Sequence, residues 1–311
     1  MSGPDLSQIN PTLLHTFLEV AEQGGVLPAS RRIHLSQPAV TARIRQLEEA
    51  LGVQLFLRSA KGMEMTSAAR RLCVHARRIR ELLREAARDV SGTKAREALS
   101  IAASTTIAAH VLPRLLARFQ QIHPVAGIEL SVGNTEEVLA QVRDGRVPLG
   151  LVEGKGKAQA VRLMPLLVDE ILPVYAPGTG DANLLSQVGK VRSAADLVRL
   201  PIVWREAGSG TRHVVEDALV KAGVRRGDLA VRFAIGETEA IKHAVLAGLG
   251  VAFLSRCSIV HELASGTLAP IPVERFAIRR TFCWALPGGG LSGTAAEFHS
   301  FAVREMATSA P

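Results

Sequence analysis

A change of pattern near residue 95 constrains the fold of this chain more than any other feature of its sequence. Before it, apolar residues recur mainly at helical spacing. After it, short apolar runs alternate with helical segments, as in "ALSIAAS" (98–104), "GIELSVG" (127–133) and "PLGLVEG" (148–154). This alternation predicts a mostly parallel sheet covered by helices. The "SGTK" segment (91–94) between the two parts is typical of a linker.

The second part is long enough for two α/β lobes with a cleft between them. We expect lobe I to comprise about 95–165 and 270–307, and lobe II about 166–269. One helix is expected over 106–124 despite Pro113, and others over 135–145, 212–222 and 237–247, with a final helix from Ala295. Further strands are expected at 171–177, 201–206, 231–236, 250–255 and 280–287.

The first part begins with helices expected over 13–23 and 27–34. A third follows in "LSQPAVTARIRQLEEALG" (35–52), where Ser36 is a good N-cap, Pro38 suits the first turn and Gly52 supplies the stop. Two helices joined by a turn near residue 35 predict a helix-turn-helix, and the strands and turn expected over 53–66 form a wing beside it. The predicted winged helix-turn-helix domain spans 10–66.

The net charge of +8 is concentrated in this first part. Residues 31–88 hold thirteen Lys and Arg against five Asp and Glu, whereas the rest of the chain balances 24 basic residues with 24 acidic ones. A localised basic block is typical of a module that binds a polyanion. A solvated basic helix is the alternative, and composition does not decide between the two.

The long helix expected over 67–90 has one narrow apolar seam. Its members alternate spacings of four and three: Leu72, Ala76, Ile79, Leu83, Ala86 and Val90. A heptad seam of this kind usually packs against another helix, and a copy of itself is the simplest candidate. We therefore predict a linker and dimerisation segment over 67–94, with packing against its own domain as the alternative.

Residues 10–90 resemble the DNA-binding half of a LysR-type transcriptional regulator. The resemblance is carried by Phe17, Val20, Ala21, the Ala29-Ser30 pair, Thr66 and the run "LSQPAVTARIRQLEEALGVQLFLR" (35–58). The α/β part resembles the periplasmic-binding-protein-like effector domain of that family, so the resemblance covers nearly the whole chain. It implies an all-α winged helix-turn-helix with a long linker helix, followed by a two-lobed α/β effector domain.

The resemblance also implies partners and contact residues. The partners are double-stranded DNA, a small-molecule effector and further copies of the chain in a homodimer or tetramer, with RNA polymerase as a candidate. Residues at the start of the third helix resemble the base-contacting face, Arg43 and Arg45 could reach phosphates or guanine edges, and other residues are expected to contact the DNA backbone. The predicted set is Ser30, Arg31, Ser36, Gln37, Pro38, Thr41, Arg43, Arg45, Arg58 and Lys61.

Loops at strand ends supply candidates for the effector site, since ligands of open α/β sheets gather at the carboxyl ends of strands and at helix N-termini. Hydroxyls, glycines and Arg side chains in these loops favour an anion held between the lobes. The candidates are Ser104, Thr105, Thr106, Asn134, Glu153, Arg205, Ser209, Gly210, Thr211, Glu237 and Thr238. The alternative is that Ser209 and Thr211 cap a helix and Arg212 pairs with an acid. "REAGSGTR" (205–212) also resembles the family's regulators of carbon-fixation and sulfur genes.

Other classes of protein are disfavoured. The three cysteines, at 73, 257 and 283, form no Cys-x-x-Cys pair, so we expect reduced thiols in the cytoplasm, and neither a metal nor a cofactor. The N-terminal sequence lacks the pattern of a secretion signal, which argues against a periplasmic solute-binding protein, and no apolar run is long enough to span a membrane. No catalytic motif supports an enzyme. A DNA-binding protein controlled by oligomerisation or redox chemistry, without an effector, remains the alternative function.

Overall fold

A computed structural model describes residues 6–59, 62–91, 98–123, 127–154, 161–288 and 290–308. The chain divides into two compact units, which we describe separately: the first comprises residues 1–95 and 144–146, and the second comprises residues 96–143 and 147–311. In the described part of the chain, no helix combines the length and apolarity needed to cross a bilayer.

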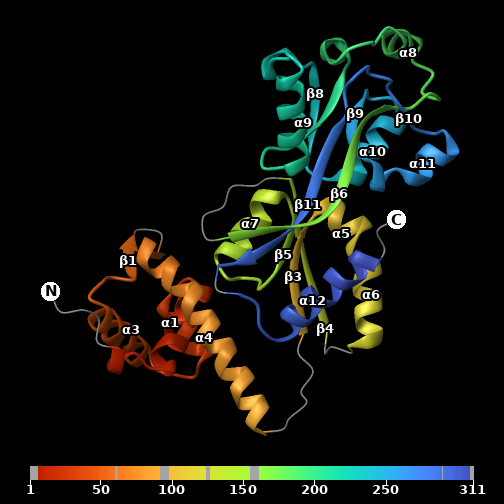
Figure 1. Cartoon of the computed structure of the whole chain (residues 1–311). Helices are drawn as coiled ribbons and strands as arrows, with labels where there is room; N and C mark the ends of the chain where they lie inside the picture. The colour runs from red at the N-terminus through yellow and green to blue at the C-terminus, as the bar shows by residue number, and fades with distance from the viewer. Residues whose placement is uncertain are drawn as a thin grey trace. The chain divides into compact units, whose positions relative to one another are not determined.

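The first unit is a winged helix-turn-helix with a long C-terminal helix (Figure 1). Its core brings together apolar side chains of all the main helices and of the wing, with Phe17, Val40, Leu47, Leu55 and Ala69 buried. Strands β1 and β2 form an antiparallel hairpin in which Phe56 pairs with Met65. The elements are η1 (Leu6–Gln8), α1 (Pro11–Gln23), α2 (Val26–Arg32), α3 (Gln37–Leu51), β1 (Phe56–Ser59), β2 (Gly62–Met65) and α4 (Ser67–Ser91).

Helix α3 begins and ends where its sequence predicts. The Ser36 hydroxyl accepts a hydrogen bond from the Ala39 N–H at 3.3 Å, and Gly52 ends the helix with a positive φ of 66°. Near its C-terminus the Glu48 carboxylate accepts hydrogen bonds from the N–H groups of Leu55 at 2.7 Å and Phe56 at 3.2 Å. An acid at this end of a helix is unfavourable for the helix dipole, and here it fixes the start of the wing instead.

Lobe I of the second unit has three layers: helices α5, α6 and α12 cover one face of the sheet and α7 covers the other. Figure 1 shows α12 beside α6 and, across the strands, α7. On the first face Leu99, Ile107, Phe119, Trp284 and Phe298 are fully buried. The elements are β3 (Ala98–Ser104), α5 (Thr105–His110), α6 (Leu112–Ile122), β4 (Gly127–Gly133), α7 (Thr135–Arg143), β5 (Gly150–Glu153) and α12 (Gly293–Thr308).

Lobe II is built from the remaining elements around the C-terminal half of β6 and the N-terminal end of β11, the two long strands that it shares with lobe I. Helices α8 and α9 pack on one core, with Trp204 and Phe253 in edge-to-face contact, while α10 and α11 pack on another. The elements are β6 (Val161–Tyr175), α8 (Ala182–Gly189), η2 (Ala194–Arg199), β7 (Ile202–Arg205), α9 (Gly210–Lys221), η3 (Arg226–Asp228), β8 (Val231–Ile235), α10 (Thr238–Leu246), β9 (Ala252–Ser255), η4 (Arg256–Ser258), α11 (Val260–Ser265), β10 (Ala269–Pro270) and β11 (Ile278–Pro287).

The expectation of a mostly parallel sheet is wrong. The larger sheet has the order β10-β6-β11-β5-β3-β4, with β9 also pairing with β6. Only β3 pairs in parallel there, with β4 and β5, while β6 and β11 pair antiparallel with each other and with their other neighbours. The reason is that β6 leaves lobe I and β11 returns to it, so these two neighbouring strands must run in opposite directions.

The single helix expected over 106–124 is also wrong, because the structure has two helices there. Helix α5 ends at His110 and α6 begins at Leu112, with Pro113 in its first turn. Proline has no N–H to continue a helix, and its ring collides with the carbonyl four residues earlier. The same residue is well suited to the start of a new helix, so the chain turns at Val111.

Candidate functional site

The exposed start of α3 carries several of the predicted DNA-binding residues. Gln37, Pro38 and Arg45 are exposed, and Thr41 is half-buried, while the apolar stripe of the helix faces the core. Arg43 is held in place within the unit, because its Nη1 donates a hydrogen bond to the Thr16 hydroxyl at 3.3 Å. The exposed part of α3 therefore offers an amide, a hydroxyl and a guanidinium to a ligand outside the unit.

The residues expected to contact the DNA backbone differ in their exposure to solvent. Arg31 is exposed, but Ser30 is buried and its hydroxyl donates to the Leu27 carbonyl at 2.9 Å. Ser30 thus stabilises α2 rather than facing outward. Arg58 belongs to β1, but its side chain and the whole of Lys61 lie outside the described residues.

The seam of α4 divides into two parts. Its first residues, Leu72 and Ala76, pack into the core of their own unit, which was the alternative expectation. The later residues of the seam are exposed to solvent in this unit: Ile79 is 38% exposed, Leu83 46% and Val90 89%, and Ala86 is also exposed. The outer half of the seam therefore leaves an apolar strip uncovered within this unit.

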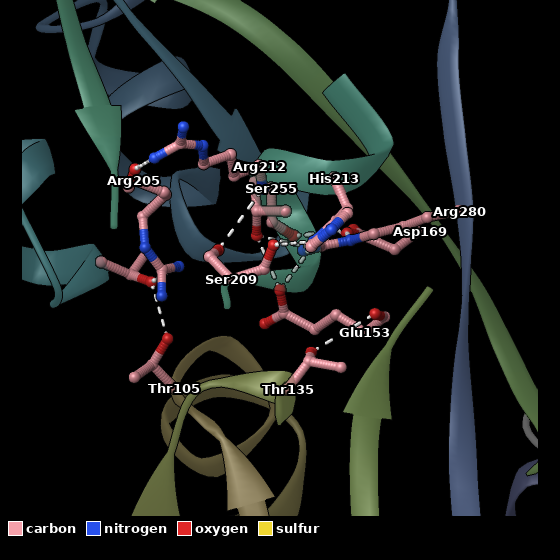
Figure 2. Close-up of polar contacts among 12 residues, drawn as sticks. Thr105, Thr135, Glu153, Asp169, Arg205, Ser209, Arg212, His213, Ser255 and Arg280 are labelled. Carbon is pink, nitrogen blue, oxygen red and sulfur yellow. Dashed lines mark hydrogen bonds and ion pairs between the residues drawn. The ribbon is translucent and has the colours of Figure 1, made fainter. Parts of the chain in front are cut away.

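In the second unit, predicted effector-site residues from both lobes meet. The hydroxyls of Thr105 (lobe I) and Thr238 (lobe II) are 3.1 Å apart, and Nη1 of Arg205 donates to the Thr238 hydroxyl at 3.1 Å. On the other side of the junction, the Thr211 hydroxyl donates to Oε2 of Glu153 at 2.6 Å. Figure 2 shows Glu153 reaching from lobe I toward the start of α9. We call these residues, with Ser104 and Thr106, the interlobe site.

A buried ion-pair network adjoins the interlobe site. Arg280, on β11, donates from Nη1 to Glu153 at 2.6 Å and to Thr211 at 2.7 Å, and from Nε to Asp169 at 2.7 Å (Figure 2). The Ser255 hydroxyl lies 2.7 Å from the same Asp169 carboxylate. Burial raises the pKa of Glu153, but Arg280, the Thr106 and Thr211 hydroxyls and Arg205 outweigh burial and lower that pKa to about 2. Glu153 is therefore an anion at neutral pH.

Three buried polar atoms of this region have no hydrogen-bond partner among the described residues: Ser104 Oγ, Glu153 Oε1 and Arg280 Nη2. Buried polar atoms are normally satisfied, so each one indicates a position where a further group could be bound. The charge of Arg205 is largely neutralised by Glu206, which accepts from Nε at 2.8 Å and from Nη2 at 3.1 Å.

Other predicted effector-site residues serve the fold. The Ser209 hydroxyl accepts from the Arg212 N–H and caps α9, Glu237 caps α10 by accepting from the Ala240 N–H, and Asn134 accepts from the Glu137 N–H. Arg212 pairs with Glu216 at 2.7 Å. Gly210 fits a space where an added Cβ would lie 2.3 Å from the Glu153 carbonyl oxygen, so it permits the close approach of α9 to β5.

Asp169, Ser255 and Arg280 were not among the site residues predicted from the sequence. For Asp169 and Arg280 the signal was a charged residue within a largely apolar strand, where an unpaired buried charge would be too costly. That signal indicates a buried partner without identifying it. Arg280 and Glu153 are 127 positions apart, so only the folded sheet brings them together.

The described residues contain no group of three or more His, Cys, Asp or Glu side chains that could hold a metal ion. All three cysteines are free, with Cys73 and Cys283 buried. Burial raises the pKa of the Cys73, Cys257 and Cys283 thiols, which reduces the fraction of reactive thiolate. This disfavours redox control through a cysteine.

Comparison with known proteins matches both units to families. Residues 11–70 match the family model for the bacterial regulatory helix-turn-helix protein of the lysR family, and residues 92–307 match the model for the LysR substrate binding domain.

Individual proteins that are similar to this chain are also named as transcriptional regulators. The chain is 36% identical over 271 residues to the HTH-type transcriptional regulator YeiE of Escherichia coli strain K12, covering 86% of this chain and 88% of YeiE. It is 34% identical over 306 residues to the RuBisCO operon transcriptional regulator of Allochromatium vinosum, covering 94% and 95%. The regulatory domain of CcmR from Synechocystis PCC6803, solved in complex with 2-PG, is 27% identical with a TM-score of 0.59, covering 68% of this chain and 98% of that domain.

Proposed function

This chain belongs to the LysR family of bacterial transcriptional regulators, and from that premise we propose that a small anionic metabolite bound at its interlobe site controls its binding to DNA. The α3 surface would read the DNA bases, and the open part of the α4 seam would pair two copies of the chain. Two copies related by a dyad would then place two α3 helices in successive major grooves.

The contact between Thr105 and Thr238 is the observation that carries the effector site. Two hydroxyls from different lobes face each other at 3.1 Å, and the Arg205 guanidinium lies beside them. An anion inserted there would accept hydrogen bonds from both lobes, and would compete with Glu206 for Arg205. The unpaired Ser104 hydroxyl, at the end of β3, adds a donor nearby.

Glu153 limits where the anion can lie. Its own carboxylate already occupies the space beside Thr211 and Arg280, and it is charged at neutral pH. A second anion in contact with it would be repelled. We therefore place the effector's charged group on the Arg205 and Thr105 side, and expect any hydroxyl or amine of the effector to point toward the unpaired Oε1 of Glu153.

The test is a binding titration on the full chain with three probes: inorganic phosphate, sulfate and 2-PG. The double variant Thr105→Val, Thr238→Val keeps the shape of both side chains and removes both hydroxyls. Loss of hydrogen bonds to a charged ligand should weaken binding by about tenfold or more. Thr238→Val also removes the acceptor of Arg205 Nη1, so the single variant Thr105→Val should be measured beside it.

Thr267→Val is a matched control, since Thr267 is exposed and its hydroxyl hydrogen-bonds with Ser265 and Glu262, outside the interlobe site. It should bind the best probe as the wild type does. Ser209→Ala is a poor probe of the ligand, because it removes the cap of α9. Failure of all three probes to bind the wild type, or equal affinity in the double variant, would contradict this effector site.

A further inference from the structure

A groove outside the interlobe site runs between α9 and the segment that leads into β11. Its volume is about 710 Å³, which is within the range of small-molecule sites. One wall is the exposed face of α9, where His213, Asp217 and Lys221 recur at every fourth position. The other wall is formed by residues 275–281.

The groove is lined by more cations than acids. Lys221, Arg275 and Arg279 are exposed and line it, and none of them forms an ion pair with another described residue. The one acid of the lining is Asp217. The acid opposite Arg279 in the strand pair, Glu170, is already bound to Arg256 at 2.9 Å. Three cations that line one groove repel each other, so the groove favours an anionic ligand.

Two further observations favour a ligand rather than a solvated basic face. Arg280 also lines the groove, its side chain is fully buried, and its Nη2 has no hydrogen-bond partner among the described residues. Arg275 adopts a φ of 53°, a left-handed backbone conformation that residues other than glycine adopt at a cost. The turn before β11 thus holds a cation in the groove at the expense of some backbone strain.

We propose that this groove is a second binding site, which takes a small polyanion such as a di- or triphosphate group. Lys221 and Arg279 would bind it from opposite walls, and Arg275 would close one end. The several negative charges of such a ligand could pair with Lys221, Arg275 and Arg279 together. An uncharged ligand would leave these three cations without a partner of opposite charge.

This proposal does not depend on the effector site, although Arg280 links the two. Arg280 is one of the residues that line the groove, and its buried guanidinium binds Glu153 and Asp169 at the junction of the lobes.

The test measures the affinity of the full chain for inorganic pyrophosphate by isothermal titration calorimetry at constant ionic strength. Lys221→Gln, Arg279→Gln should weaken pyrophosphate binding at least tenfold, because two charge-assisted contacts are lost. The control Lys190→Gln, Arg232→Gln removes the same charge from exposed positions outside the groove, and should change affinity less than about twofold.

The Thr105→Val, Thr238→Val variant separates the two sites, and should bind pyrophosphate in the groove as the wild type does. Absence of pyrophosphate binding to the wild type would overturn the proposal. So would equal losses in the groove and control variants, or loss of binding only in the Thr105→Val, Thr238→Val variant. A groove variant that changes oligomeric mass with unchanged pyrophosphate affinity would assign the groove to a contact between copies instead.

Discussion

Replacing Glu153 by Gln should weaken the effector unit in a way that depends on pH. Glu153 is 2% exposed and is bound by Thr211 and Arg280. Gln keeps its size and one acceptor oxygen but removes the charge, so Arg280 would retain Asp169 as its only carboxylate partner. The variant therefore tests whether the buried carboxylate itself stabilises the fold.

The expected magnitude follows from the lowered pKa. A carboxyl whose pKa falls from 4.5 in the unfolded chain to about 2 in the folded one stabilises the fold by about 3 kcal/mol at neutral pH. Because the pKa is lower in the folded state, this contribution is complete above about pH 4.5 and is lost as the pH falls toward 2. The difference between the wild type and Glu153→Gln should shrink over that window.

Tryptophan fluorescence during urea unfolding is a suitable assay. The chain has two tryptophans, and both Trp204 and Trp284 are buried in the effector unit, one in each lobe, so the signal reports this unit alone. The free energy of unfolding should be measured at about pH 7 and again at about pH 3. Glu274→Gln, at an exposed position, is the matched control and should have little effect.

Two results would refute the reasoning. A Glu153→Gln chain as stable as the wild type at neutral pH would mean that the cost of burying the carboxylate cancels its attraction to Arg280. A large loss that stays constant from neutral to acidic pH would attribute the effect to packing rather than to charge.

Three further predictions concern the first unit. Gln37→Ala and Thr41→Ala should each weaken binding to an operator selected from random DNA by about 1–3 kcal/mol, with little effect on scrambled DNA in a gel-shift assay; equal losses on both would contradict a base-reading role. The double variant Ile79→Glu, Leu83→Glu should dissociate the proposed dimer, which light scattering would detect as a lower mass; an unchanged mass would show that the seam is not the interface. Glu48→Ala should lower the stability of the unit by about 2–3 kcal/mol in thermal unfolding, since two backbone N–H groups of the wing lose a charged acceptor; Glu48→Gln should lose less.

Local features of the fold could be predicted from the sequence. The bounds of α3 follow from Ser36, Pro38, Gly52 and a 3.6-residue period, all within one segment. The break at Pro113 was equally local, but an uninterrupted apolar period over 106–124 concealed it. A proline is compatible with a helix start and with a kinked helix, and the sequence alone does not distinguish the two.

Sheet direction and the buried network could not be predicted in the same way. Both depend on the register between β6 and β11, in which Asp169 lies opposite Arg280 across 111 positions of the chain. Period and composition describe one segment at a time, so they do not show which charged residues of distant segments meet. The effector loops illustrate the same limit: Ser209 and Thr211 lie two residues apart, yet one caps a helix and the other binds Glu153.

The return of β11 to lobe I has a consequence for the order of folding during synthesis. The core of lobe I joins Leu99 and Ile101 to Trp284 and Phe298, whereas the core of lobe II lies within the continuous stretch from Ile171 to Ile278. On a ribosome, lobe II can therefore complete its core while lobe I still lacks one strand and a covering helix. Until α12 is made, the part of the apolar face of lobe I that α12 covers stays exposed to chaperones or to aggregation. A chain cut within β11, just after Ile278, should retain the core of lobe II but no closed lobe I.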